Sequence, residues 1–219
     1  LNPITQKEAK ALFDAVKRGT KGKRAEVVIC PPFLYLPIFK GLTLGAQNIF
    51  WEHEGAFTGE ISASQIKDLG VEYVIVGHSE RRRYFNETDE IVNKKIKKAL
   101  AVDLKIIFCV GENEREDKQI ILETQITQGL KNISREHLKH IVVAYEPVWA
   151  IGTGNSCSVD QTMSSVLLIR KIILKLYNRQ LADDVKVLYG GSVDSKNSGS
   201  YIKEAGVNGR HAGHKIPKG

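Results

Sequence analysis

Short apolar runs alternate along the chain with longer segments whose apolar residues recur every three or four positions. The runs are rich in valine and isoleucine, which is typical of parallel strands covered on both faces. Six strands are predicted, at residues 26–30, 43–46, 71–76, 104–110, 140–145 and 185–189. Helices are predicted at residues 3–18, 87–102, about 114–130, 158–176 and 195–205. The alternation predicts an α/β protein with one parallel sheet.

Local signals support two of these helices. Pro3 suits a first helical position after Asn2, because proline lacks an N–H that this position leaves unused. Ser158 can cap the segment that follows it. Its apolar stripe consists of Val166, Ile169, Ile173 and Leu176.

Two architectures fit such an alternation, an open doubly wound sheet and a closed (β/α)8 barrel. An open dinucleotide-binding sheet carries Gly-x-Gly-x-x-Gly after its first strand. Pro31-Pro32 stands there instead. Polar and glycine residues follow nearly every strand, at 47–48, 77–80, 111–112, 146–147 and 190–192. Barrels place their active sites at this end of the strands, so we predict one (β/α)8 barrel domain over residues 1–219.

Composition narrows the function classes. The 219 residues include 32 Lys and Arg against 25 Asp and Glu, a net charge of +7, and three cysteines. Three cysteines cannot staple a chain of this size, and no run reaches the ~18 apolar residues of a membrane span. The lysines lie mainly on predicted helices, such as residues 93–98, which argues against nucleic-acid and membrane partners. With no signal peptide at its polar start, the chain is expected in the cytoplasm.

Candidate chemistry lies at three strand ends. Glu146 ends an apolar strand, where partial shielding can make a carboxylate a general base, although a surface salt bridge is an equally good interpretation. His78 could polarise a substrate oxygen, but a structural histidine capping a turn is the more common case. Residues 147–154 suit a lid with Pro147 at one hinge. Residues 189–193 could bind phosphate or form a simple Gly-Gly turn.

Taken together, these strings resemble one known family. Val-Gly-His-Ser-Glu-Arg-Arg at 76–82, Ala-Tyr-Glu-Pro-Val-Trp-Ala-Ile-Gly-Thr-Gly at 144–154 and Leu-Tyr-Gly-Gly-Ser-Val at 188–193 are similar to motifs of the triosephosphate isomerases. Residues 44–48, 55–60 and 109–112 match further strings. The resemblance runs in order from about residue 1 to residue 209.

The resemblance implies interconversion of dihydroxyacetone phosphate and D-glyceraldehyde 3-phosphate. It implies Glu146 as the base and a neutral His78 that polarises the carbonyl and moves protons between the enediolate oxygens. Gly152, Ser192 and Gly213 would bind the phosphate, with Ser79, Glu80 and Cys109 as supporting residues. No metal or organic cofactor is expected. Residues 47–60 resemble a loop that inserts into a second subunit, which implies a homodimer.

Both ends of the chain depart from the family pattern. The family begins with a strand that carries an Asn and a Lys, and this chain starts just after that strand would end. Near the other end, His214 replaces a second phosphate glycine, and Arg210 and His211 fit poorly in an apolar barrel wall. We therefore expect a first strand that is absent, an eighth strand and final helix that are incomplete, and little activity without the missing Lys.

Three other interpretations stay open beside the active isomerase. The chain could be a catalytically impaired barrel fragment, a non-catalytic scaffold that retains the fold, or a different phosphate-binding barrel isomerase or lyase.

Overall fold

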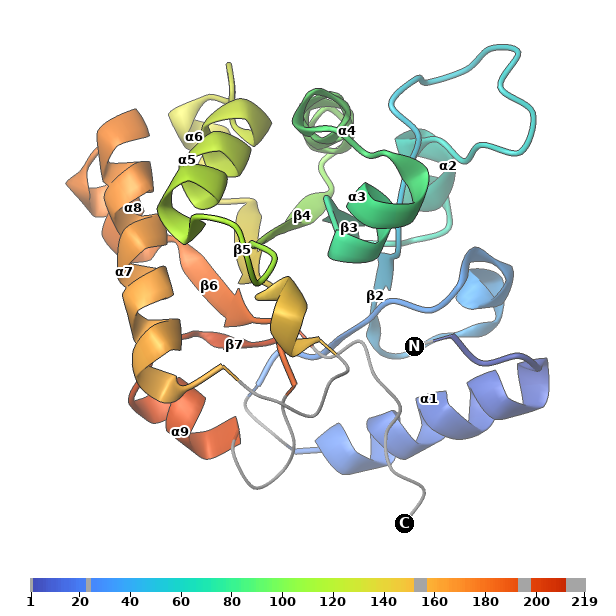
Figure 1. Ribbon diagram of the computed structural model, residues 1–219. Helices are drawn as coiled ribbons and strands as arrows, with labels where there is room; N and C mark the ends of the chain where they lie inside the picture. Colours follow the sequence, from blue (N-terminus) through green and yellow to red (C-terminus); the bar gives the residue numbers. More distant parts are fainter. Residues whose placement is uncertain (1, 23–24, 152–156, 193–197, 212–219) are drawn as a thin grey trace.

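The strands of the protein form one curved, all-parallel sheet (Figure 1). The computed structural model describes residues 2–22, 25–151, 157–192 and 198–211. Within these ranges seven strands are hydrogen-bonded to their neighbours in chain order. They are β1 (Val28–Ile29), β2 (Thr43–Ala46), β3 (Tyr73–Val76), β4 (Lys105–Val110), β5 (Ile141–Tyr145), β6 (Lys186–Tyr189) and β7 (Gly209–Arg210).

Helices lie around the outside of this sheet (Figure 1). They are α1 (Gln6–Thr20), α2 (Ala63–Asp68), α3 (Ser79–Phe85), α4 (Asp89–Leu100), α5 (Lys118–Gly129), α6 (Arg135–Leu138), α7 (Val159–Leu176), α8 (Arg179–Asp184) and α9 (Ser198–Lys203), with 3-10 turns η1 (Phe33–Ile38) and η2 (Val148–Ala150). In the described part of the chain, none of the helices has the length and apolar character needed to cross a bilayer. The curved parallel sheet with outer helices confirms the predicted barrel class.

The strands pack on both faces because successive side chains point to opposite sides. Val74 and Val76 of β3 belong to the large apolar cluster that the sheet shares with the helices. The intervening Tyr73 and Ile75 belong to a second, smaller cluster, together with residues of β4 and β5. This double burial explains why the strands are continuous apolar runs.

The N-terminal helix starts later than predicted. Pro3 is not its first residue, because Thr5 is the N-cap of α1 and its side chain accepts a hydrogen bond from the Glu8 N–H. The Glu8 carboxylate accepts in return from the Thr5 N–H. This reciprocal capping box satisfies two backbone donors, which proline at the start cannot do.

The prediction for α7 is confirmed at its start and wrong near its end. Ser158 caps the helix, accepting from the Gln161 N–H. Val166, Ile169 and Ile173 are buried, but Leu176 is 39% exposed and Ile172 is buried instead. The short helices α2, α6 and α8 were not predicted, because four to six residues are too few to show a helical period.

The expected erosion of the last strand does not prevent pairing. β7 aligns Gly209 with Leu188 and Arg210 with Tyr189 of β6. The His211 N–H continues the ladder by donating to the Tyr189 carbonyl at 2.9 Å. Ladder bonds use backbone atoms, so basic side chains at these positions are compatible with a strand. Arg210 is exposed, which removes the predicted conflict with an apolar wall.

A buried carboxylate fixes the turn after β3. Glu87 accepts hydrogen bonds from the Gly77 N–H at 2.9 Å, from Arg81 Nε at 2.7 Å and from Lys95 Nζ at 2.5 Å. Lys95 also donates to Asn48 Oδ1, beyond the end of β2, at 2.6 Å. Three chain segments therefore donate to one carboxylate, and Lys95 connects it to a fourth. His78 directly follows the turn that they hold.

The geometry of this turn requires glycine. Gly77 has a φ of +77°, a conformation that side-chain-bearing residues rarely adopt. A Cβ there would also lie 3.0 Å from the Cys109 carbonyl oxygen. The direction in which the chain leaves β3, and with it the position of His78, thus depends on the absence of a side chain.

Two isoleucines of α5 offer a matched test of the core. Ile126 is fully buried, whereas Ile120 is 63% exposed. We expect Ile126→Ala to lower the free energy of unfolding by about 2–5 kcal/mol, because it leaves a cavity, and Ile120→Ala to change it by less than about 1 kcal/mol. Denaturant unfolding of both variants measures the difference. Equal losses would contradict the assigned faces of α5.

The Glu87 network predicts a loss of stability in acid. Burial by itself raises the pKa of Glu87, but Lys95 and Arg81 outweigh it and hold the pKa below its usual value. A lowered pKa in the folded state contributes stability that is complete above the unfolded value of about 4.3 and is lost as pH falls through the folded value. Glu87→Gln should therefore cost about 3–5 kcal/mol at pH 7 and flatten the pH dependence below pH 4.

Urea unfolding at several pH values between neutral and acidic measures this effect. The exposed Glu90, in the first turn of α4, supplies the control variant Glu90→Gln, which should follow the wild-type curve. A Glu87→Gln variant with the wild-type slope in acid would refute the role given to this carboxylate.

Candidate active site

The two candidate catalytic side chains meet at the carboxyl ends of the parallel strands. His78 follows β3 and Glu146 follows β5, and β4 lies between these strands and pairs with both. His78 Nε2 lies 3.4 Å from Glu146 Oε1. The two residues are 68 positions apart in the sequence, and the parallel sheet brings them together.

Glu146 is held in a closed environment. Its side chain is only 2% exposed, and its backbone N–H donates to the Val110 carbonyl at 2.8 Å, which continues the sheet. The Ser79 N–H donates to Oε2 at 3.2 Å. Beside it, burial and then the Glu146 carboxylate raise the pKa of the Cys109 thiol well above its usual value. Cys109 is therefore a neutral neighbour of this carboxylate.

Two glycines make room for Glu146. A Cβ on Gly190, after β6, would lie 2.7 Å from Glu146 Cγ. A Cβ on Gly111, after β4, would lie 1.8 Å from the Glu146 carbonyl oxygen. The sequence marked both glycines as strand-end residues but did not predict this role. The close approach of strands from both sides is what requires them.

A backbone hydrogen bond orients the ring of His78. It is the N-cap of α3, and its Nδ1 accepts from the Glu80 N–H at 3.3 Å. An accepting Nδ1 leaves the single proton of a neutral imidazole on Nε2. Nε2 is the nitrogen that faces Glu146. The capping role that sequence analysis set against a chemical role is therefore real, and it orients the ring for chemistry.

A second histidine, His211, also lies near the Glu146 carboxylate. The sequence analysis did not include it among the site residues. His211 is 12% exposed and its Nε2 lies 4.0 Å from Glu146 Oε1. Its ring centroid is 5.8 Å from that of His78. Burial lowers the pKa of His211, and the nearby Glu146 offsets this only in part. Ligand atoms of His78, Glu146 and His211 all lie within 4.8 Å of one another, which is close enough for a metal ion.

The predicted phosphate-binding residues are only partly described. Ser192, after β6, donates from its Oγ to the Ala150 carbonyl at 2.7 Å, which ties this segment to η2. Gly152 and Gly213 lie outside the described residues.

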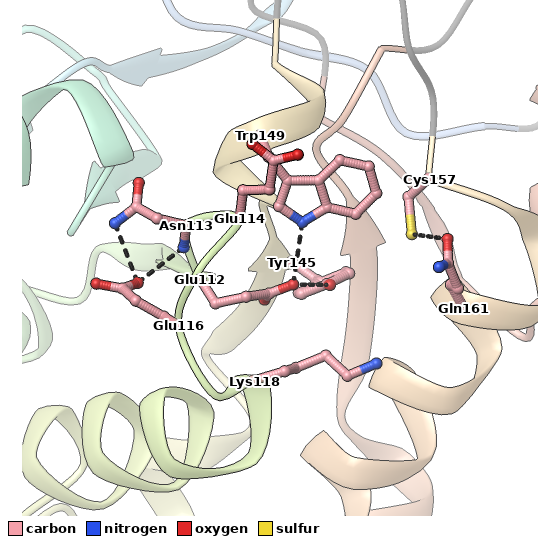
Figure 2. Close-up of a pocket in the computed structure, with 9 residues that line it drawn as sticks. All are labelled: Glu112, Asn113, Glu114, Glu116, Lys118, Tyr145, Trp149, Cys157 and Gln161. Atoms are coloured by element: carbon pink, nitrogen blue, oxygen red, sulfur yellow. Dashed lines mark hydrogen bonds between the residues drawn. The ribbon is translucent and has the colours of Figure 1, made fainter.

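A polar cavity of about 130 Å³ adjoins the site, and Figure 2 shows the side chains that line it. Glu112 is a buried residue of this lining, and its Oε1 accepts from the Tyr145 hydroxyl at 2.9 Å and from Trp149 Nε1 at 3.3 Å. Tyr145 precedes Glu146, and Trp149 lies in η2. Glu112 therefore links the strand that carries Glu146 to the first described turn of the predicted lid.

Comparison with known proteins agrees with this geometry. The family model described as "Triosephosphate isomerase" matches residues 2–217. Proteins named triosephosphate isomerase from Alkaliphilus oremlandii and Caldanaerobacter subterraneus subsp. tengcongensis are 43% and 44% identical to the chain. The alignments cover 94% and 95% of this chain and 88% of each relative.

A similarly named protein from Dictyoglomus thermophilum is 46% identical over 92% of this chain and 84% of its own length. The family model spans nearly the whole chain, and the parallel strands bring the two strand-end motifs together. The chain therefore belongs to the triosephosphate isomerase family.

Proposed function

We propose that this protein interconverts dihydroxyacetone phosphate and D-glyceraldehyde 3-phosphate. The observation that carries the proposal is the 3.4 Å approach of an imidazole to a buried carboxylate at the carboxyl ends of parallel strands. Proton transfer between neighbouring carbons needs a base for the carbon and a donor for the oxygen, and these two groups supply both. The names of the relatives support the same substrate.

Glu146 acts as the base in this proposal. It removes a proton from the carbon beside the carbonyl, and the carbon–hydrogen bonding electrons form the double bond of an enediolate. The same carboxylic acid then returns a proton to the neighbouring carbon. Its burial excludes water, which strengthens its interaction with the reacting carbon, and Ser79 holds one oxygen from the backbone.

His78 acts on the oxygens. Its Nε2–H donates to the carbonyl oxygen and stabilises the negative charge that develops there. It then carries protons between the two oxygens of the enediolate. Glu80 keeps Nδ1 an acceptor, so the ring works as a neutral donor. Because His78 and Glu146 are 3.4 Å apart, the substrate must separate them as it enters.

The remaining predicted residues position the substrate in this proposal. Ser192 binds the phosphate together with the backbone of Gly152 and Gly213, and Cys109 packs beside the base. We infer that the carboxylate and the imidazole carry the proton transfers without a cofactor. A scaffold that retains only the fold is not favoured, because these side chains are arranged for proton transfer.

The cellular setting belongs to the same proposal. We infer a homodimer from residues 47–60, which resemble the family's subunit-inserting loop and are exposed over residues 53–60. We also infer a cytoplasmic location, where triose phosphates are metabolised.

Glu146→Gln tests the assigned base. The amide keeps the shape of the side chain but cannot accept the carbon proton, so kcat should fall by about 10²–10⁴-fold with little change in KM. A coupled assay in both directions, on the full-length protein, measures the rates. Glu90→Gln on the outer face of α4 is the control and should keep the wild-type rate. A Glu146→Gln rate within about tenfold of wild type would overturn the assignment.

Sedimentation equilibrium tests the homodimer. The chain has a mass of 24.4 kDa, so the proposal expects a species of twice the chain mass that persists on dilution to micromolar concentrations. Thr58→Arg should shift the equilibrium toward the monomer, because it places charge and bulk on the exposed loop. A monomeric wild-type protein at all concentrations would contradict the dimer.

A further inference from the structure

Within the part of the chain that the structure describes, His211 is a largely covered titratable group beside Glu146 that the proposed mechanism does not use. Its imidazole projects from the residue after β7 toward the same carboxylate that His78 faces. We propose that His78, Glu146 and His211 together form a binding site for a zinc ion, and that zinc bound there inhibits the enzyme. The inhibition rests on the proposed isomerase function, whereas the binding does not.

The distances approach those of a zinc site and require a movement of His211. Zinc bonds to histidine nitrogen and carboxylate oxygen are about 2.0–2.2 Å long, so two ligand atoms of a tetrahedral ion lie about 3.4 Å apart. His78 Nε2 already lies 3.4 Å from Glu146 Oε1, and His211 Nε2 lies 4.0 Å from the same oxygen. The three donors all lie within 4.8 Å of one another, so closure takes a movement of about 1.4 Å or less between the donors.

The donor set selects the class of metal. Two imidazoles and one carboxylate are a combination that zinc adopts when it keeps a fourth position for water. Magnesium and calcium prefer oxygen ligands, so two nitrogen donors discriminate against them. The carboxylate is nearly inaccessible to water, and a bound cation would compensate its charge.

A neighbouring residue is placed to support the metal-bound form of His78. Zinc takes the lone pair of Nε2, so the proton of the neutral ring moves to Nδ1 and the number of protons on the ring is unchanged. Nδ1 then loses the hydrogen bond from the Glu80 N–H, but Glu80 Oε2 lies 3.9 Å away and can accept the new N–H. Carboxylates commonly hold metal-bound histidines in this manner.

The same atoms of Glu146 and His78 cannot bind zinc and carry out the proton transfers at the same time. Zinc would occupy the Glu146 oxygen that removes the carbon proton and the His78 nitrogen that donates to the carbonyl. Substrate and metal should therefore exclude each other, and inhibition should be competitive. A requirement for zinc in the reaction is not part of the proposal.

The test uses the full-length protein freed of metal by a chelator. Cobalt(II), a spectroscopic substitute for zinc, should give visible absorption bands of a four-coordinate nitrogen–oxygen site, and zinc should displace them at one ion per chain. Calorimetry with zinc should give the same stoichiometry, and magnesium should give no binding. In the assay, micromolar zinc should raise the apparent KM, and chelator should restore it.

Two histidine variants locate the site. His211→Gln should weaken zinc binding and zinc inhibition by about tenfold or more, with inhibition expressed relative to the uninhibited rate of each variant. His137→Gln, on exposed α6, is the matched control and should retain wild-type affinity. Thermal melting of both variants verifies that they are folded.

Each outcome decides one claim. Absence of cobalt bands and calorimetric binding in the wild-type protein, or unchanged affinity in His211→Gln, would overturn the zinc site. Cobalt and zinc binding that depends on His211, in a protein without isomerase activity, would support the site and refute the proposed function. Binding that depends on His211 but leaves the rate unaffected would overturn the inhibition.

Discussion

The carboxylate of Glu87 is the constraint on which the geometry of the site depends. It is buried, so its charge is tolerable only because Lys95, Arg81 and the Gly77 N–H all donate to it. These partners come from the turn after β3, from α3 and from α4. Because Lys95 also reaches Asn48, the turn is tied to the neighbouring strand end. These hydrogen bonds therefore hold the backbone turn that His78 directly follows.

Glu146 is positioned by the opposite means, namely close packing instead of charge pairing. Gly111 and Gly190 flank it, and a methyl group on either would overlap its atoms. Gly111 faces the backbone of Glu146 and Gly190 faces its side chain, and the Ser79 N–H donates to the carboxylate. The hydrogen bonds of Glu87 position His78, and the close packing of Gly111 and Gly190 positions Glu146. Together they place the two candidate catalytic side chains 3.4 Å apart. Neither arrangement requires the substrate to be present.

The features that could be predicted from the sequence are those that depend on neighbouring residues or on a motif shared with a known family. Apolar runs predicted the strands, and Ser158 predicted the start of α7, because capping is a short-range interaction. The Glu87 network was not predicted, since its partners lie as far apart as Asn48 and Lys95 and only the sheet brings them together. His211 was interpreted as a defect of an apolar wall. Periodicity does not reveal that the side chain of a strand-end residue faces a buried carboxylate.

The site illustrates how close proton-transfer chemistry is to metal binding. A neutral imidazole and an ionised carboxylate that are ready to exchange protons with a substrate also carry lone pairs that a metal ion can accept. Two such donors hold zinc weakly, because the ion needs at least a third protein ligand to compete with water. If the residue after β7 were apolar, His78 and Glu146 would be the only two ligands that the described part of the chain places here, and they would bind zinc weakly. With His211 there, 4.0 Å from the carboxylate, a third donor comes within reach of the other two. One side chain at the end of the last described strand is therefore sufficient to add a metal-binding property to a proton-transfer site.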